Sequence, residues 1–292
     1  MKKRKILVLG GAGFLGSHVA DELSHINYDV TIFDKNKPKF PNDKHNYLIS
    51  DINNKSNLAK AIKNSHAVFY FADMADITES RIEYIKTINQ NIIQLVEILE
   101  ICKKSKIKHF IYASSLYVYS ESGSFYRASK QCAEILIKEF SKVSKFDYKL
   151  LRYGSLYGER AQKWNGIQKF IDQIISKGKI IYKGNGKEIR EYIHVKDAAK
   201  LSALVVSKKL KNNVISIFGQ KSITVDQLFN LMFEIYGKKK RVKYLNSINA
   251  DDHYGFSPYR FVPENSIKLT SNMSTDLGEG ILRLFNLNDK KK

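Results

Sequence analysis

The sequence predicts an α/β protein built on a parallel sheet that is covered by helices on both faces. Short β-branched segments alternate with helical patterns of apolar residues along the first half of the chain, and a glycine-rich turn follows the first of these segments. Strands and helices that alternate at this spacing form right-handed βαβ units, which build a doubly wound sheet. At 292 residues the chain is near the limit for one core, so a second, smaller lobe is expected.

The first half of the chain supplies the elements of the sheet in order. Apolar β-branched runs predict strands, and apolar residues at helical spacing predict helices. The expected strands are residues 4–9, 29–34, 66–72, 109–113 and 148–152. The expected helices are residues 16–27, 59–63, 84–103 and 126–144.

The alternation becomes less regular after about residue 158. Helices are expected near residues 167–176 and 224–236, with a turn at residues 184–186 between them. We therefore expect residues 1–157, with a contribution from about 190–218, to form the larger domain. Residues 158–292 are expected to form mainly a smaller C-terminal α/β lobe. No linker rich in Pro, Gly or Ser divides the chain, which predicts two packed lobes with a cleft between them.

The composition excludes several classes of protein. Apolar residues make up 43% of the chain, which is enough to exclude a disordered protein. Two cysteines, Cys102 and Cys132, are too few for a disulfide framework and favour a reduced, cytoplasmic setting. No apolar run approaches the roughly 18 residues that span a bilayer, and glycines interrupt the apolar start. Neither a membrane segment nor a signal peptide is expected.

The chain is strongly basic, with 49 Lys and Arg against 29 Asp and Glu and a net charge of +20. Such a charge attracts nucleic acids, anionic lipids and anionic substrates alike. The lysines are scattered, however, and no basic stripe with interleaved aromatic residues appears, so a nucleic-acid partner is not expected. The seven histidines show no metal-ligand spacing, so no metal site is expected either.

A glycine-rich turn between the first strand and the first helix predicts a dinucleotide site. Gly10, Gly13 and Gly16 form a G-x-x-G-x-x-G pattern there. Glycines allow a tight turn and a close approach of backbone N–H groups to a pyrophosphate, and the helix N-terminus adds its dipole. Asp34 ends the second strand, where a carboxylate suits the adenosine ribose hydroxyls. It would repel the 2′-phosphate of NADP, so NAD is favoured, although Lys35 beside it favours NADP.

The spacing of Tyr126 and Lys130 places the two side chains one turn apart on one helix face. An ammonium group close to a phenol favours the phenolate, so Tyr126 is a candidate acid and base for a substrate hydroxyl. Ser115 stands at the end of the preceding strand, where ligands bind in open α/β sheets. It is expected to hydrogen-bond the reacting oxygen.

Together these motifs make the sequence resemble the extended short-chain dehydrogenase/reductase family, and within it the nucleotide-sugar epimerases and dehydratases such as UDP-galactose 4-epimerase. The resemblance implies a Rossmann fold and covers about residues 5 to 200. It is carried, in order, by Gly10 to Gly16, Asp34, residues 50–52, 71–72, 91–92, 113–119 and 126–130, and then residues 151–158 and 190–197.

The resemblance also implies roles for single residues. Lys130 would bind the nicotinamide ribose as well as tune Tyr126, and Tyr153 would approach the nicotinamide. Other residues implied to contact the cofactor are Phe14, Leu15, Lys35, Asp51, Ile52, Phe71, Ala72 and Asn91. For a nucleoside-diphosphate sugar, Arg190 would pair with the diphosphate, Tyr182 would stack on the base or pack in the core, and Ser155 and Arg260 are candidate substrate contacts.

Three departures from the family pattern bear on the reaction. Leu116 and Tyr117 replace the acidic residues that dehydratases and decarboxylases carry, which favours epimerisation or simple redox chemistry. The stretch between Ser115 and Tyr126 is short, so a pocket wall is missing or rebuilt. Asp73 stands where a small residue is usual.

The leading hypothesis is an NAD-dependent nucleotide-sugar 4-epimerase that acts through a transient 4-keto sugar. A 4-ketoreductase or dehydrogenase would use the same residues, and a non-catalytic nucleic-acid-binding protein is the distant alternative. The apolar stripe of Ile88, Ile92, Leu95 and Leu99 predicts a helix that packs on the sheet or in a homodimer interface.

Overall fold

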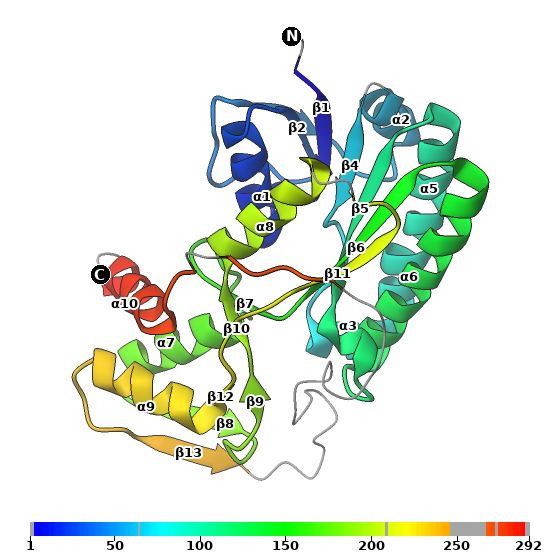
Figure 1. Cartoon of the computed structure of the whole chain (residues 1–292). Coiled ribbons are helices and arrows are strands. Elements are labelled where there is room, and N and C mark those ends of the chain that lie inside the picture. Colours follow the sequence, from blue (N-terminus) through cyan, green and yellow to red (C-terminus); the bar gives the residue numbers. More distant parts are fainter. Residues whose placement is uncertain (1–2, 64, 208–209, 246–266, 272–273, 290–292) are drawn as a thin grey trace.

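A computed structural model describes residues 3–63, 65–207, 210–245, 267–271 and 274–289 (Figure 1). One eight-stranded sheet dominates it, and every pairing within that sheet is parallel. Its strands, in spatial order, are β3 (His45–Ile49), β2 (Asp29–Asp34), β1 (Lys5–Leu9), β4 (Ala67–Tyr70), β5 (His109–Ser115), β6 (Asp147–Tyr153), β11 (Asn213–Ile217) and β14 (Ile267–Lys268). The strand order reverses between β1 and β4, and this is the switch point at which open α/β sheets bind ligands.

Helices cover both faces of the sheet (Figure 1). On one face α1 (Phe14–His25) packs against α8 (Val195–Ser207). On the other face α2 (Lys55–Lys63) packs against α5 (Gln94–Ser105), and α5 packs against α6 (Ser124–Ser144). The connection from β4 to α5 consists of α3 (Ile77–Ile82), α4 (Tyr84–Ile88) and a π-helical turn (Asn89–Ile93).

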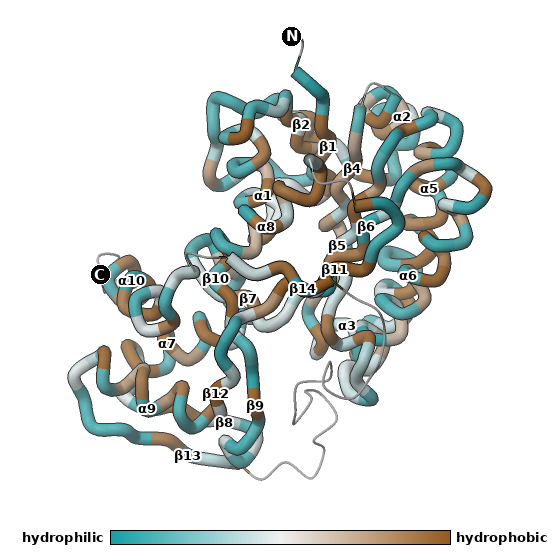
Figure 2. Tube along the Cα trace, in the orientation of Figure 1, coloured by the Kyte–Doolittle hydropathy of each residue, from teal (hydrophilic) through white to brown (hydrophobic). Residues whose placement is uncertain are grey.

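Alternate residues of each strand face alternate layers of the core, as the period of two in a strand requires. In β1, Ile6 and Val8 pack with the layer beneath α1 and α8, whereas Leu7 and Leu9 pack with the layer beneath α2, α5 and α6. Figure 2 shows the apolar residues concentrated on the central strands and on the inner sides of the helices. The parallel strands are therefore buried on both faces, which fixes the register of the strand ends that carry the site.

The smaller lobe has short strands and its own core. Tyr157, Ile171, Phe229 and Phe285 are among the residues buried there. The strands pair as β7 (Ser155–Tyr157) with β10 (Tyr192–His194), β9 (Ile189–Arg190) with β12 (Ile223–Thr224), and β8 (Ile180–Lys183) with β13 (Val242–Leu245). The helices of this lobe are α7 (Gly166–Lys177), α9 (Val225–Ile235) and α10 (Leu277–Asp289).

The predicted fold class is confirmed. The five predicted strands appear as β1, β2, β4, β5 and β6, and the predicted helix over 84–103 appears as α4, the π-helical turn and α5. The sequence reasoning missed β3, whose residues are largely exposed at the edge and lack an apolar alternation. Among the described helices, none combines the length and the apolar character needed to cross a membrane.

Candidate active site

The glycine turn of the large domain has no room for side chains. Gly10 has φ +78°, and a Cβ there would lie 2.7 Å from the carbonyl carbon of Phe71. A Cβ on Gly16 would overlap the carbonyl oxygen of Gly10. Gly13 caps α1 without a side-chain hydrogen bond, so the backbone N–H groups of the first turn remain available to an anion. This cradle fits the pyrophosphate of a dinucleotide.

Asp34 lies at the end of β2 beside this turn. Its Oδ2 accepts a hydrogen bond from the backbone N–H of Ala12 at 3.1 Å, and its Oδ1 accepts one from Asn36 at 2.9 Å. The carboxylate therefore ties the glycine turn to the end of β2. Lys35, the next residue, is exposed.

Tyr126, Lys130 and Ser115 are brought to the carboxyl end of the sheet by two adjacent elements. Ser115 ends β5 and is buried, and its Oγ accepts a hydrogen bond from the backbone N–H of Tyr117 at 3.2 Å. Tyr126 lies in the first turn of α6 and is partly exposed, and Lys130, one turn on, is buried. The Lys130 Nζ atom lies 5.7 Å from the centroid of the Tyr126 ring. The Tyr126 ring and the Lys130 ammonium therefore lie near each other on α6 at the carboxyl end of the sheet.

The ammonium of Lys130 also makes a contact that the sequence reasoning did not predict. Its Nζ lies 2.6 Å from Asp73 Oδ2, and both side chains are only 4% exposed. The hydroxyl of Tyr112 donates to the same Oδ2 at 2.6 Å, and Nζ donates to the carbonyl of Ala113 at 2.6 Å. Burial, and then the charge of Asp73, raise the pKa of Tyr112 well above its ordinary value, so Tyr112 remains a donor.

The side chain of Asn91 hydrogen-bonds the backbone of the segment that follows β4. It is fully buried, and its Oδ1 accepts from the backbone N–H of Met74 at 2.7 Å. Its Nδ2 donates to the Met74 carbonyl and to Ser129 Oγ, each at 3.0 Å. Asn91 thus fastens the chain next to Asp73 onto α6, the helix that carries Lys130.

A second buried pair fastens α6 to the ends of β5 and β6. The guanidinium of Arg152 donates from Nε to Glu134 Oε1 at 2.9 Å and from Nη2 to Glu134 Oε2 at 2.5 Å. The hydroxyl of Ser114 donates to the same Oε1 at 2.5 Å, and Arg152 also hydrogen-bonds Tyr119. The bidentate geometry is the strong form of such a pair. It holds Ser115 and α6 in a fixed relation.

The short stretch between Ser115 and Tyr126 is built around Tyr117. Its ring stands edge-on to the ring of Tyr126, with the centroids 6.0 Å apart and an interplanar angle of 76°. Gly123 has φ +106°, and a Cβ there would lie 2.6 Å from Cδ1 of Tyr117. The Tyr117 ring therefore packs between Gly123 and the ring of Tyr126.

The other predicted cofactor residues lie around the same edge of the sheet. Phe14 begins α1, and Phe71 stacks on Phe69 with centroids 6.0 Å apart. Tyr153 ends β6, and its hydroxyl is 2.7 Å from Ser202 Oγ; burial raises its pKa. Leu15, Ile52 and Ala72 are partly exposed, and the exposed Asp51 accepts from the backbone N–H of Asn53.

The predicted substrate residues lie in the smaller lobe. Ser155 begins β7, and Arg190 is buried on β9, where its Nη1 donates to the carbonyl of Ile189. Tyr182 packs edge-on against Phe170 and Phe229, with centroids 5.9 and 5.3 Å apart. It is therefore part of an aromatic cluster, one of the two roles considered for it. Arg260 lies outside the described residues.

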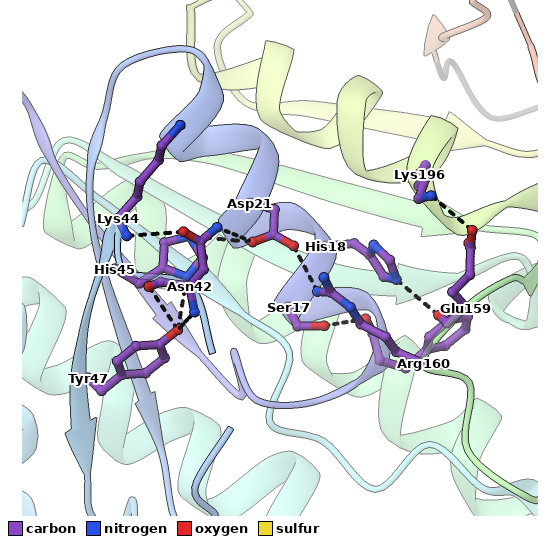
Figure 3. Close-up of polar contacts among 11 residues, drawn as sticks. Ser17, His18, Asp21, Asn42, Lys44, His45, Tyr47, Glu159, Arg160 and Lys196 are labelled. Carbon is purple, nitrogen blue, oxygen red and sulfur yellow. Dashed lines mark hydrogen bonds and ion pairs between the residues drawn. The ribbon is translucent and has the colours of Figure 1, made fainter. Parts of the chain in front are cut away.

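A polar network joins α1 to the segment that follows β7 (Figure 3). The Nε2 of His18 lies 3.0 Å from the carbonyl of Glu159, and Arg160 pairs with Asp21 at 2.8 Å. Lys196 of α8 binds the Glu159 carboxylate at 2.9 Å. Within the part of the chain that the structure describes, no group of three or more His, Cys, Asp or Glu side chains is arranged to hold a metal ion.

Comparisons with known proteins agree with this geometry. Residues 6–217 match the family described as NAD dependent epimerase/dehydratase family. A putative UDP-glucose 4-epimerase of Methanocaldococcus jannaschii is 31% identical over 249 residues, covering 78% of this chain and 81% of the relative.

Solved structures give the same picture. The UDP-glucose 4-epimerase of Thermotoga maritima, solved with UDP-glucose, superposes with a TM-score of 0.85 at 25% identity, over 98% of this chain and 99% of that one. The UDP-glucuronic acid 4-epimerase of Bacillus cereus, solved with UDP-glucuronic acid and NAD, shares the fold with a TM-score of 0.84 at 21% identity, over 99% of this chain and 100% of that one.

Proposed function

Since the chain belongs to the NAD-dependent epimerase/dehydratase family, we propose that it is a nucleotide-sugar 4-epimerase that acts through a transient 4-keto sugar. The observation that carries the proposal is the grouping of Tyr126, Lys130 and Ser115 at one end of the sheet, without an acidic residue at positions 116 and 117. A 4,6-elimination or a decarboxylation needs a further acid at this point. The M. jannaschii relative, named as a putative 4-epimerase, supports the same choice.

In this proposal NAD binds along the carboxyl end of the sheet. Gly10, Gly13 and Gly16 would receive the pyrophosphate, and Asp34 would receive the adenosine ribose. When bound, NAD supplies a hydride acceptor and donor for the sugar carbon. Asp34 supports NAD over NADP, because its carboxylate would repel a 2′-phosphate.

In the reaction proposed here, Tyr126 removes the proton from the C4 hydroxyl oxygen of the sugar and later returns it. Lys130 lies beside Tyr126 and would bind the cofactor ribose, and Ser115 would hydrogen-bond the reacting oxygen and stabilise the charge that develops on it. Inversion requires the flat keto sugar to turn between the two proton transfers. The substrate contacts proposed in the smaller lobe are Arg190 for the diphosphate and Ser155.

Proton NMR of the purified chain with NAD and a panel of UDP-, GDP- and dTDP-hexoses tests this function. We expect a C4 epimer to appear without net formation of NADH, and no epimer with Tyr126→Phe. Tyr148→Phe is the matched control, because Tyr148 lies at the opposite, amino-terminal end of β6. Stoichiometric consumption of NADH with a keto sugar would instead identify a reductase. No conversion of any sugar in either direction would refute the proposal.

We also propose that the protein is a homodimer through α4 and α6. Exposed apolar side chains gather on these helices and the segments next to them: Ile82, Ile85, Ile93, Phe125, Ile135 and Val143. The aromatic rings of Tyr84 and Phe125 stack with centroids 5.2 Å apart, which places α4 beside the start of α6. Light scattering should give the mass of a dimer, and Ile135→Glu should give that of a monomer. A monomeric wild-type protein would refute this proposal.

A further inference from the structure

Two basic segments of the smaller lobe, distant in the sequence, are paired in the fold. Residues 173–187 contain four lysines and no acidic residue, and residues 235–245 contain four lysines, one arginine and no acidic residue. These segments carry β8 and β13, which pair in parallel with Ile180 opposite Val242. The backbone N–H of Ile180 donates to the carbonyl of Arg241 at 2.9 Å. The fold therefore gathers around one strand pair a positive charge that the sequence shows as two short clusters.

The two strands turn alternate side chains toward the core and toward solvent, as strands do. Ile180, Tyr182, Val242 and Tyr244 pack in the core of the smaller lobe, where both tyrosine rings lie against Phe229, with centroids 5.3 and 6.4 Å away. The residues that alternate with them form an outer face, and all of them are exposed: Lys179, Ile181, Lys183, Arg241, Lys243 and Leu245.

This outer face is basic and partly apolar. Ile181 and Leu245 are 38% and 36% exposed, and each lies directly across the strand pair from a lysine. Within the described part of the chain, the four basic side chains of the face have no ion-pair partner, whereas the neighbouring Lys240 binds Asp226 at 2.5 Å. In Figure 1, β13 runs along the margin of the smaller lobe that lies away from the large sheet. The positive charge of the face is therefore open to a partner.

A partner for this face must carry negative charge and must also accept apolar side chains. The surface of a bilayer with anionic lipids offers both, since its headgroups attract lysine and arginine and the acyl boundary takes up apolar side chains. A single-stranded nucleic acid stacks its bases on exposed aromatic rings, but Tyr182 and Tyr244 both pack in the core. The composition of the outer face thus favours a lipid surface.

We propose that the outer face of β8 and β13 docks the protein on the surface of a membrane that contains anionic lipids. Attachment of this kind is peripheral and needs no helix that crosses the bilayer. Each basic residue close to an anionic membrane contributes about 5-fold in affinity, so the four basic residues of the face must act together. The proposal does not rest on the sugar chemistry proposed above, and the two fail separately.

Sedimentation of the full chain with lipid vesicles tests the proposal. The protein should bind vesicles of phosphatidylcholine and phosphatidylglycerol but not vesicles of phosphatidylcholine alone, and binding should weaken as the salt rises from about 0.1 M to about 0.5 M. Lys183→Gln combined with Lys243→Gln should weaken binding by about 25-fold. Lys63→Gln combined with Lys104→Gln is the matched control, because it removes the same charge from exposed sites on α2 and α5. It should change binding by less than about 2-fold.

A second pair of substitutions tests the apolar part of the face at constant charge. Ile181→Ser combined with Leu245→Ser should weaken binding to the anionic vesicles by about 10-fold, because the exposed parts of both side chains lose their burial among the lipids. A purely electrostatic adsorption would not respond to this change. A melting temperature equal to that of the wild type shows that each variant remains folded.

Four results would overturn the proposal. Absence of binding to the anionic vesicles would remove it directly. Equal losses in the two double lysine variants would mean that net charge alone, and not the outer face, brings the protein to lipid. Unchanged binding of the double serine variant would mean that Ile181 and Leu245 do not enter the bilayer. Binding of a short RNA duplex through the same lysines, without binding to vesicles, would identify a nucleic acid as the partner instead.

Discussion

Acid should weaken the fold through His18, which lies on α1 and hydrogen-bonds the carbonyl of Glu159 (Figure 3). Burial, as the largest cause, lowers the pKa of His18 from 6.5 to about 4. The folded state therefore holds the imidazole neutral, while the unfolded chain binds a proton as the pH falls below 6.5. Stability is fully present above the unfolded pKa and is lost as the pH falls through this window toward 4.

The size of the effect follows from the same values. Between pH 7 and pH 5 the imidazole of the unfolded chain takes up a proton, whereas that of the folded chain stays largely neutral. At pH 5 the pH lies roughly 1.5 units below the unfolded pKa of 6.5. At about 1.4 kcal/mol per unit, the free energy of unfolding falls by about 2 kcal/mol. For a chain of this length the corresponding fall in melting temperature is about 3 °C.

Thermal unfolding of the wild-type chain and of His18→Gln at pH 7 and pH 5 isolates this contribution, because other histidines also titrate. Glutamine keeps a donor for the Glu159 carbonyl and has no titrating group. The variant should lose about 2 kcal/mol less than the wild type on acidification. His25→Gln, at the exposed end of the same helix, is the control. On acidification it should lose as much free energy of unfolding as the wild type. An identical fall for wild type and His18→Gln would refute the argument.

Further substitutions test the packing and helix capping of the fold by urea unfolding. Gly16→Ala places a Cβ against the Gly10 carbonyl and should cost about 1–3 kcal/mol and weaken NAD binding. Gly166→Ala, with no atom within 4 Å of the new Cβ, should change stability by less than about 1 kcal/mol. Arg152→Met leaves Glu134 buried and unpaired and should cost about 3–5 kcal/mol, whereas adding Glu134→Leu should restore much of this loss. Thr224→Ala removes the capping box of α9 and should cost about 1 kcal/mol.

Local sequence signals were sufficient for the core of the large domain. Residues 29–34 were expected as a strand and form β2, because buried parallel strands are continuous β-branched runs. The glycine turn was equally readable, since Gly10 and Gly16 are required by backbone geometry alone. The short strands of the smaller lobe, such as Ile189–Arg190, gave no such signal, because two residues cannot show a period.

The ion pair and the buried hydrogen bonds of the site could not be predicted from local sequence signals. Lys130 was expected to tune Tyr126, but its ion pair joins residues 57 positions apart, on α6 and after β4. Asn91 was recognised as part of a motif, while its partners Met74 and Ser129 appear only in the folded chain. The signal that was present was Asp73 itself, an acidic residue at the end of a buried strand where a small one is usual.

The network of Figure 3 gives a reason to expect that the cofactor turn and the smaller lobe are coupled. Glu159 follows β7, the first strand of that lobe; its carbonyl binds His18 on α1, and its carboxylate binds Lys196 on α8. The imidazole of His194, 3.2 Å away, holds the pKa of this carboxyl well below its usual range, so the charge persists. Because α1 starts at the glycine turn, a ligand bound at this turn would contact the same helix that binds the Glu159 carbonyl. A change of position of the lobe would therefore strain the contacts that Glu159 makes with α1 and α8.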